Sequence, residues 1–299
     1  MLRSLTKQGG KIRVAVIGNC QARPLAAALE KKYPEIEVCY TGIVHLLGDQ
    51  DYEKFEYEIN LADIVVAQRV SDNYPCEFVR TDYLMSLCNE KLLRIVNLYF
   101  TGYNPELRYI RLPGIGHLRG PLAEYHSDTV LSAWHEGLSA TDTVMRLSDP
   151  DFNSEHYLQS AHESFKSLAI REQDVDIKAI DVIDSRWKSE RLFFSFNHPS
   201  LSLLNAYTNR IGDALGLDPS NSVISEQSEP LGQIKLPANP VSGFVEHTPT
   251  WEGFLIENMN GTNIELGKRC HWQPIDIVNS WFRIYDSSRN ELEVSVLAA

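Results

Sequence analysis

Short apolar, β-branched runs alternate with helical patterns along the first hundred residues. Four runs have the composition of buried strands, at residues 14–17, 36–40, 64–67 and 92–98. Residues 22–32 and 75–90 carry apolar side chains at helical spacing, and the acidic stretch 45–60 is interpreted as a solvated face. This alternation predicts an α/β fold, with a parallel sheet covered by helices on both faces.

The middle of the chain predicts further helices. Ser127 begins a helix that ends at Gly137, and Ser139 or Thr141 begins another. Residues 154–183 predict a long helical insertion with a break. Residues 192–196 are expected to form the last strand of the core, followed by a helix over 201–215 that Gly216 closes.

The composition changes after residue 217. Residues 218–250 contain five prolines and predict an extended polar segment, residues 251–266 predict short strands, and residues 275–285 predict a terminal helix. This part of the sequence contains no second group of hydrophobic residues large enough to form the core of another domain. We therefore expect an α/β catalytic domain over 11–217 and a C-terminal extension, 218–299, packed on the same domain.

Composition and charge narrow the class of protein. With 43% hydrophobic and 23% charged residues, the chain is that of an ordinary globular protein. Its net charge of −12 argues against nucleic acid as the main partner. No apolar run is long enough to span a membrane, and the first ten residues are too short and polar for a signal peptide. Five cysteines without C-x-x-C spacing indicate reduced thiols in a cytoplasmic protein and no metal site.

The most informative stretch joins the first predicted strand to the first helix. Gly18 and Asn19 interrupt the strand and tolerate a positive φ, so Cys20 and Gln21 lie at the helix N-terminus. The helix dipole there favours a thiolate, and its N–H groups can stabilise an oxyanion. Cys20 is accordingly a candidate nucleophile, with a structural role at the strand end as the alternative.

Two amides lie at the ends of other predicted strands. Gln68 ends the third strand and Asn97 lies near the end of the fourth, where ligands collect in parallel sheets. We expect both to converge with Gly18, Asn19 and Gln21 on an oxyanion or substrate site.

Two histidines are candidate bases. His198 stands between a predicted strand and a helix, and His126 stands beside a helix N-terminus. An N-terminal cap is the alternative role for His198. An acidic partner could be Asp181 or Asp184, although neither has the usual spacing from His198.

Residues 99–126 form a long Gly- and Pro-rich loop that is locally basic in an acidic chain. Its glycines miss the dinucleotide-binding fingerprint, so a Rossmann site is rejected. Arg111, His117 and Arg119, together with Arg23, are the residues expected to bind a phosphate-bearing cofactor. Ordinary surface charge is an equally good explanation for the loop.

The order of strand, turn and nucleophile fits the first block of SGNH/GDSL-type hydrolases, with a thiol in place of the hydroxyl. The block Gly18-Asn19-Cys20-Gln21 also resembles the WcbI family of polysaccharide-biosynthesis proteins, over residues 11–217. The other segments that fit this family are 62–68, 99–105, 125–127 with Gly137 downstream, and 197–199.

The resemblance implies a three-layer SGNH-hydrolase-like fold and an acetyltransferase that uses coenzyme A or acetyl-coenzyme A. It also implies a saccharide acceptor in capsular or other surface-polysaccharide biosynthesis. Cys20 would carry the acyl group with His198 or His126 as base, or would only shape an oxyanion site for direct transfer. A thiol-based esterase and a non-catalytic protein that binds coenzyme A or a sugar nucleotide are the alternatives. A homo-oligomer is compatible with the sequence.

Overall fold

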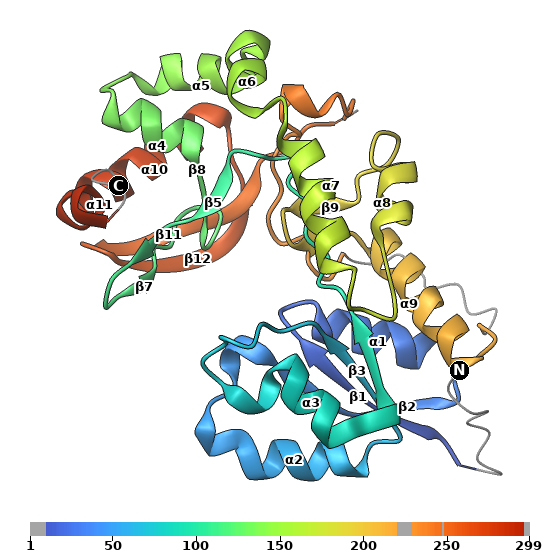
Figure 1. Cartoon of the computed structure of the whole chain (residues 1–299). Helices are drawn as coiled ribbons and strands as arrows, with labels where there is room; N and C mark the ends of the chain where they lie inside the picture. Colours follow the sequence, from blue (N-terminus) through green and yellow to red (C-terminus); the bar gives the residue numbers. More distant parts are fainter. Residues whose placement is uncertain (1–9, 220–228, 247, 296–299) are drawn as a thin grey trace. The chain divides into compact units, whose positions relative to one another are not determined.

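The computed structural model describes residues 10–219, 229–246 and 248–295 (Figure 1). The first nine residues, which we interpreted as too polar for a signal peptide, lie outside the described residues. So does part of segment 218–250, which we expected to be extended. The chain forms two compact units. The first unit comprises the described residues of Met1–Tyr99, Phe165–Arg186 and Asn197–Leu231. The second comprises those of Phe100–Ser164, Trp187–Phe196 and Gly232–Ala299.

The first unit is built on the predicted parallel sheet. Its strands are β1 (Ile12–Gly18), β2 (Ile36–Ile43), β3 (Ile64–Gln68) and β4 (Leu92–Ile95), in the order β2-β1-β3-β4. Val16 of β1 pairs with Val66 of β3, which in turn pairs with Leu93 of β4. Because β2 and β3 lie on opposite sides of β1, the carboxyl ends of β1 and β3 meet at a topological switch point.

Helices flank this sheet (Figure 1). These are α1 (Ala22–Lys32), α2 (Tyr52–Leu61) and α3 (Thr81–Cys88). The unit also includes α8 (Ile180–Arg186), α9 (Leu201–Leu215) and the part of α7 (Ser160–Arg171) from Phe165 on. Phe55 and Ile59 of α2 are buried against Ala15 and Ile17 of β1, so the acidic stretch 45–60 has an apolar face as well. On α9, a Cβ at Gly212 would overlap the ring of Tyr33 at the end of α1, so glycine permits their close packing.

Some predicted boundaries in this unit change. The helix expected over 75–90 is confined to α3, because residues Glu77–Val79 form a separate 3-10 turn and Arg80 is extended. The long helix expected over 154–183 is three helices, namely α6 (Pro150–Tyr157), α7 and α8. The expected core strand at 192–196 is wrong. Its counterpart, β9 (Phe193–Ser195), is not one of the four strands of the sheet and belongs to the second unit.

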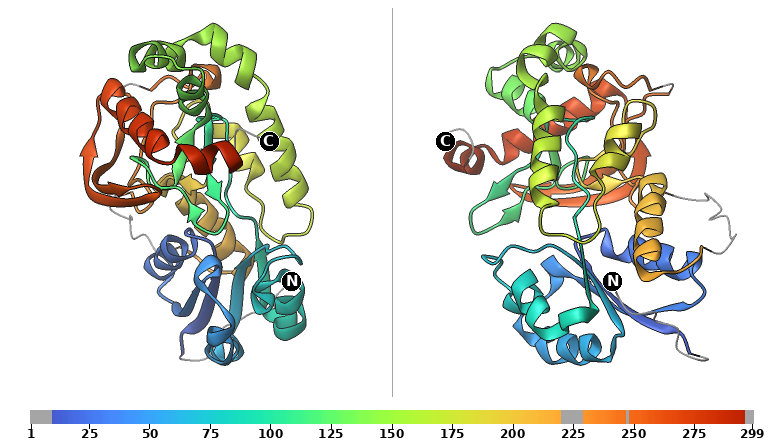
Figure 2. Two further views of the ribbon diagram at one scale, coloured as in Figure 1. Left: turned by 90° about the vertical axis from the view of Figure 1, so that its left-hand side faces the viewer. Right: turned by 45° about the vertical axis from the view of Figure 1, so that its right-hand side comes forward.

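The second unit combines the loop region 100–127 with the C-terminal part of the chain (Figure 2). Antiparallel pairs join β5 (Leu107–Tyr109) to β8 (Tyr125–Ser127), β6 (Arg111–Leu112) to β7 (Gly116–His117), and β11 (Glu252–Asn260) to β12 (Asn263–His271). Its helices are α4 (Asp128–His135), α5 (Ala140–Ser148), α6, α10 (Pro274–Ser287) and α11 (Arg289–Ser295).

Helix α10 contributes large side chains to the core of this unit. Its Trp281 and Tyr285 are fully buried, and Tyr285 contacts the rings of His126 and Trp134. The units therefore do not follow the boundary expected at residue 217, because residues 232–295 complete a core begun by residues 100–164. No helix among the described residues is long and apolar enough to cross a membrane.

Candidate functional site

The turn after β1 carries Cys20 and is fixed by the end of β3. The N–H of Asn19 donates to Gln68 Oε1 at 2.8 Å, and the N–H of Gln21 donates to Asn19 Oδ1 at 2.9 Å. A Cβ on Gly18 would lie 2.7 Å from Gln68 Oε1. The expectation of a positive φ here is wrong, because neither Gly18 nor Asn19 has one. Glycine is needed at position 18 for space.

Gln21 is buried and joins three segments of the first unit. Its Nε2 donates to the carbonyl oxygens of Leu98 at 2.6 Å and Asn197 at 2.9 Å. Its Oε1 accepts from Gln68 Nε2 at 2.9 Å and from the N–H of Leu98 at 3.0 Å. A glutamine amide has two donor hydrogens and two acceptor lone pairs. All four are used, so the Gln21 side chain holds the site together and is not available to bind a ligand.

The expected convergence of amides is therefore found for Gln21 and Gln68, in a supporting role. Cys20, which lies between Asn19 and Gln21, is half-buried and directly precedes the first turn of α1. Asn97 is held differently. Arg171 of α7 donates from Nη1 to the carbonyl oxygen of Asn97 at 2.8 Å and to its Oδ1 at 2.6 Å.

Sequence reasoning missed Arg171. Its Nη2 also donates to the carbonyl oxygen of Tyr99 at 3.2 Å, and its guanidinium lies over the Tyr99 ring. Burial lowers the pKa of Arg171. A cation thus lies beside the strand end at Asn97. No short motif marks it, because α7 follows β4 by more than sixty residues.

His198 lies next to one of the residues to which the Gln21 side chain bonds. It follows Asn197, the residue whose carbonyl Gln21 binds, and precedes α9, which Ser200 caps by accepting from the N–H of Leu203. Burial lowers the pKa of His198 to about 4. The imidazole is therefore neutral near pH 7 and can accept a proton. The expected cap role falls to Ser200 instead.

His126 lies in the second unit and is fully buried. Its Nε2 is 3.1 Å from the carbonyl oxygen of Leu118, and its Nδ1 is 3.1 Å from the Tyr285 hydroxyl. Since a carbonyl only accepts, Nε2 carries the proton and Nδ1 accepts from Tyr285. Burial lowers the pKa of His126 to about 4. Both ring nitrogens are thus occupied within the core.

Of the two carboxylate candidates, Asp181 has another partner and Asp184 is exposed. Asp181 forms an ion pair with Arg210 on α9, and Nη1 of that arginine donates to Asp181 Oδ1 at 2.8 Å. This pairing lowers the pKa of Asp181 and removes it as an orienting partner for His198. Asp184 is exposed on α8.

The basic residues divide between the two units. Arg23 is exposed on α1 in the first unit. In the second, Arg111 pairs with His117 across the β6–β7 hairpin, and His117 stacks on Tyr109 with its Nδ1 3.9 Å from Glu124 Oε2. Arg111 and Arg119 are exposed, and within the described residues no carboxylate pairs with either, so both can attract a phosphate.

The cysteines form neither a disulfide nor a metal site in the described residues, which include all five of them. Burial raises the pKa of Cys39, Cys76 and Cys270, and raises the pKa of Cys88 to about 11. These four thiols are held in the protonated, unreactive form.

Comparisons with known proteins agree with this fold. A family model described as polysaccharide biosynthesis enzyme WcbI matches residues 13–220. A solved structure is similar with a TM-score of 0.69 and 19% identity, covering 95% of this chain and 98% of the other. It is described as WcbI, a novel polysaccharide biosynthesis enzyme, in native form without a disulfide bond between coenzyme A and one of its cysteines. No curated protein sequence matches the chain.

Proposed function

Because the chain belongs to the WcbI family of polysaccharide biosynthesis enzymes, we propose that it transfers an acyl group, acetyl in the first instance, from coenzyme A to a saccharide hydroxyl. In this proposal the first unit supplies the reaction centre in an SGNH-like arrangement, and Cys20 is the nucleophile. The capsule or another surface polysaccharide is the product to which the modified saccharide contributes.

One observation carries the proposal. The Gln21 side chain hydrogen-bonds to the carbonyl of Asn197, and so ties the Cys20 turn to the segment that presents His198. A thiol at a helix N-terminus and a neutral imidazole are the two groups that acyl transfer through a thioester requires. A buried, fully bonded glutamine between them is the kind of support that keeps reacting groups in place.

The covalent route balances with these groups. The Cys20 thiolate attacks the acyl carbon of acyl-coenzyme A, a new thioester forms, and coenzyme A leaves as a thiolate that takes up a proton. The saccharide hydroxyl then attacks the Cys20 thioester while His198 accepts its proton. The C–S bond breaks, and the Cys20 thiolate is restored.

Two further observations support coenzyme A as the donor. The similar solved structure is described in terms of coenzyme A and one of its own cysteines. In the first unit of this chain Arg23 is exposed three residues after Cys20, and its guanidinium group fits a phosphate of coenzyme A in charge. Arg111 and Arg119, exposed on the second unit, are separate candidates for contact with a phosphate.

The test is to trap the intermediate. The protein is mixed with acetyl-coenzyme A, quenched in acid and digested, and the peptide that contains Cys20 is weighed. We expect one acetyl group on Cys20, and none on that peptide in Cys20→Ala, whereas Cys39→Ala should still be acetylated at Cys20. Acetyl transfer to a saccharide without any acetyl-Cys20 would favour the direct route through His198.

A second measurement tests the thiol itself. Iodoacetamide should alkylate Cys20 below about pH 8 faster than it alkylates Cys39, Cys76, Cys88 and Cys270, and coenzyme A should protect it. Saturating coenzyme A should also raise the melting temperature, because a ligand at about 100 times its Kd stabilises the fold by about 2.7 kcal/mol. Absence of both protection and stabilisation contradicts the proposal.

A further inference from the structure

The second unit contains a cavity of about 160 Å³ that is lined by none of the candidate site residues discussed so far. Its apolar wall includes Val144 and Leu147 of α5, Pro240, Trp251 and Pro274, and its polar lining includes Glu106 and Asn239. Among the lining residues Glu106 has the only ionisable side chain. The cavity therefore combines an aromatic and aliphatic wall with one carboxyl group.

Glu106 is buried, and its carboxyl group has capacity left for a ligand. Asn239 Nδ2 donates to Glu106 Oε2 at 3.0 Å and to Asn153 Oδ1 at 2.6 Å, so both of its hydrogens are used. Asn104 Nδ2 donates to Glu106 Oε1 at 3.4 Å and to the carbonyl of Pro237 at 2.7 Å. Each carboxyl oxygen can accept a second hydrogen bond. A donor group on a ligand would supply it.

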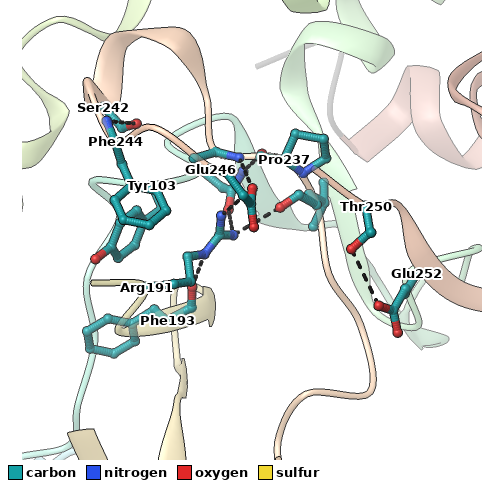
Figure 3. Close-up of polar contacts among 12 residues, drawn as sticks. Tyr103, Arg191, Phe193, Pro237, Ser242, Phe244, Glu246, Thr250 and Glu252 are labelled. Atoms are coloured by element: carbon teal, nitrogen blue, oxygen red, sulfur yellow. Dashed lines mark hydrogen bonds and ion pairs between the residues drawn. The ribbon is translucent and has the colours of Figure 1, made fainter. Parts of the chain in front are cut away.

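The part of the cavity wall formed by Pro237 and Ala238 is held by Arg191 and Glu246, which Figure 3 shows near Pro237. Arg191 Nη2 donates to Asn104 Oδ1 and to the carbonyl of Leu236, both at 3.0 Å. Its Nη1 donates to Glu246 Oε2 at 3.2 Å, and the same oxygen accepts from the N–H of Ala238 at 3.2 Å. These bonds hold Pro237 and Ala238 against the cavity. The cavity is thus formed in advance of binding.

The volume of the cavity and the charge of Glu106 restrict the class of ligand that it can bind. A cavity of about 150 Å³ accepts a single benzene ring, whereas drug-sized ligands occupy about 300–1,000 Å³. Coenzyme A is too large for this cavity, and Glu106 repels phosphate and carboxylate groups. A six-membered ring fits if it has an apolar face for Trp251 and the prolines and a hydroxyl or amine for Glu106.

We propose that this cavity binds one pyranose ring that is uncharged or carries an amine, with Glu106 accepting a hydrogen bond from a ring substituent. This is a saccharide site of the second unit, and it rests on the cavity and its lining, not on acyl transfer at Cys20. Burial raises the pKa of Glu106 to about 7, so the carboxylate is available as an acceptor at and above neutral pH.

The experiment is saturation-transfer NMR on the full chain with methyl β-D-glucopyranoside, glucosamine, glucuronate and phenol as probes. We expect signals from the first two sugars and none from glucuronate. Val144→Phe fills the cavity while keeping Glu106, and should weaken sugar binding more than about tenfold. Glu106→Gln should weaken it about fivefold, because a hydrogen bond to a charged group is replaced by a neutral one.

Two controls separate this inference from the proposed function. Glu257→Gln changes an exposed carboxylate on β11 and should leave sugar binding unchanged, as should Cys20→Ala. Failure of both sugars to bind, equal binding of glucuronate, binding of phenol alone, or an unaffected Val144→Phe overturns the cavity assignment. None of these results bears on the acetylation of Cys20, which is measured separately. The cavity assignment and the proposed acyl transfer can therefore fail independently.

Discussion

Each unit of the molecule buries a polar network, and the two networks differ in charge. In the first unit, Gln21 and Gln68 bond to one another and to backbone groups, and every member is neutral. In the second, the network includes the ionisable groups Arg191, Glu106 and Glu246, with asparagine amides between them. One network holds a turn and the other holds the wall of a cavity.

This difference in charge determines how the stability of each network depends on pH. Neutral amides gain from their hydrogen bonds without a large desolvation cost, and they do not titrate, so the Cys20 turn keeps one geometry over a wide pH range. Buried charges lose solvation, and their stability depends on every partner remaining in place. Burial lowers the pKa of Arg191 and raises that of Glu106 for this reason. Of the two networks, only that of the second unit therefore contains groups whose titration changes its stability with pH.

The largest effect is expected from Arg191→Met. The substitution removes the donor to Glu246, Asn104 and the Leu236 carbonyl and leaves Glu246 without its ion-pair partner. The free energy of unfolding should fall by about 3–5 kcal/mol. Urea unfolding, followed by tryptophan fluorescence, measures the change.

Arg210→Met is the matched control. Arg210 also forms an ion pair, with Asp181, but that aspartate side chain is 65% exposed. Its loss should cost less than about 1 kcal/mol. Similar losses for the two variants would show that burial of the charge is not what distinguishes the second unit.

The next largest effect is expected from Glu106→Gln, which should change how the free energy of unfolding depends on pH. The pKa of this carboxyl is about 7 in the fold and 4.5 ordinarily. Between these values the folded protein keeps the proton and the unfolded chain loses it, so stability falls as pH rises. At 1.36 kcal/mol per pH unit the fall amounts to about 3 kcal/mol, and it is absent from the variant.

Measuring the two proteins at the same pH values isolates Glu106. His126 and His198, whose pKa values are lowered to about 4, act in the opposite direction, because the unfolded chain binds their protons first as pH falls below about 6.5. They are present in both proteins and cancel in the difference. Parallel stability profiles from pH 4.5 to 7 would contradict an elevated pKa for Glu106.

A somewhat smaller loss, about 2–3 kcal/mol, is expected for Gln21→Leu. Leucine fills most of the space but removes the Gln21 amide that donates to the carbonyls of Leu98 and Asn197. The loss should be the same at pH 5 and pH 8, because nothing in this network titrates. Acetylation of Cys20 should also slow.

Gln50→Leu, at an exposed position, should change stability by less than about 0.5 kcal/mol. If the loss for Gln21→Leu varies with pH as much as the wild-type stability does, the contrast between the two units is not one of charge.

The smallest effect is expected from Gly18→Ala. The added Cβ must displace Gln68 Oε1 from a distance of 2.7 Å and so weakens its bond to the N–H of Asn19. A loss of about 1–2 kcal/mol is typical of such overpacking. Gly10→Ala, where a Cβ meets nothing within 4 Å, is the control and should be neutral. Adding Gln68→Ala to Gly18→Ala should relieve the clash, so the two losses should not add.

The elements that local sequence specifies were predictable. The helix expected over 22–32 is confirmed as α1, and the four strands of the sheet are confirmed with their ends shifted. Ser127 caps α4 as expected, whereas α9 is capped by Ser200, for which we predicted no such role. Gly137 and Gly216 have the positive φ values that end a helix. These features depend on neighbours within a few residues, which the sequence shows directly.

Apart from the contact between Gln21 and Gln68, the polar networks were not predictable, because their partners are far apart in the chain. Gln21 meets Asn197, 176 residues later, and Glu106 meets Asn239, 133 residues later. A charged residue such as Arg191 reads as surface in a sequence, since nothing local indicates that Glu246 and two carbonyls surround it. For the same reason β9 reads as a core strand, and the C-terminal segment as an extension.

The Gln21–Asn197 bond also bears on how the protein is made. A ribosome that adds about 5–20 residues per second needs about 10–35 s to pass from one residue to the other. Until then a nascent chain has its sheet and its Cys20, but the turn that holds the thiol lacks its second carbonyl. Truncated products that end before Asn197 would carry an exposed cysteine on an unfinished support. The support of the Cys20 turn is thus completed only when about two thirds of the chain has been made.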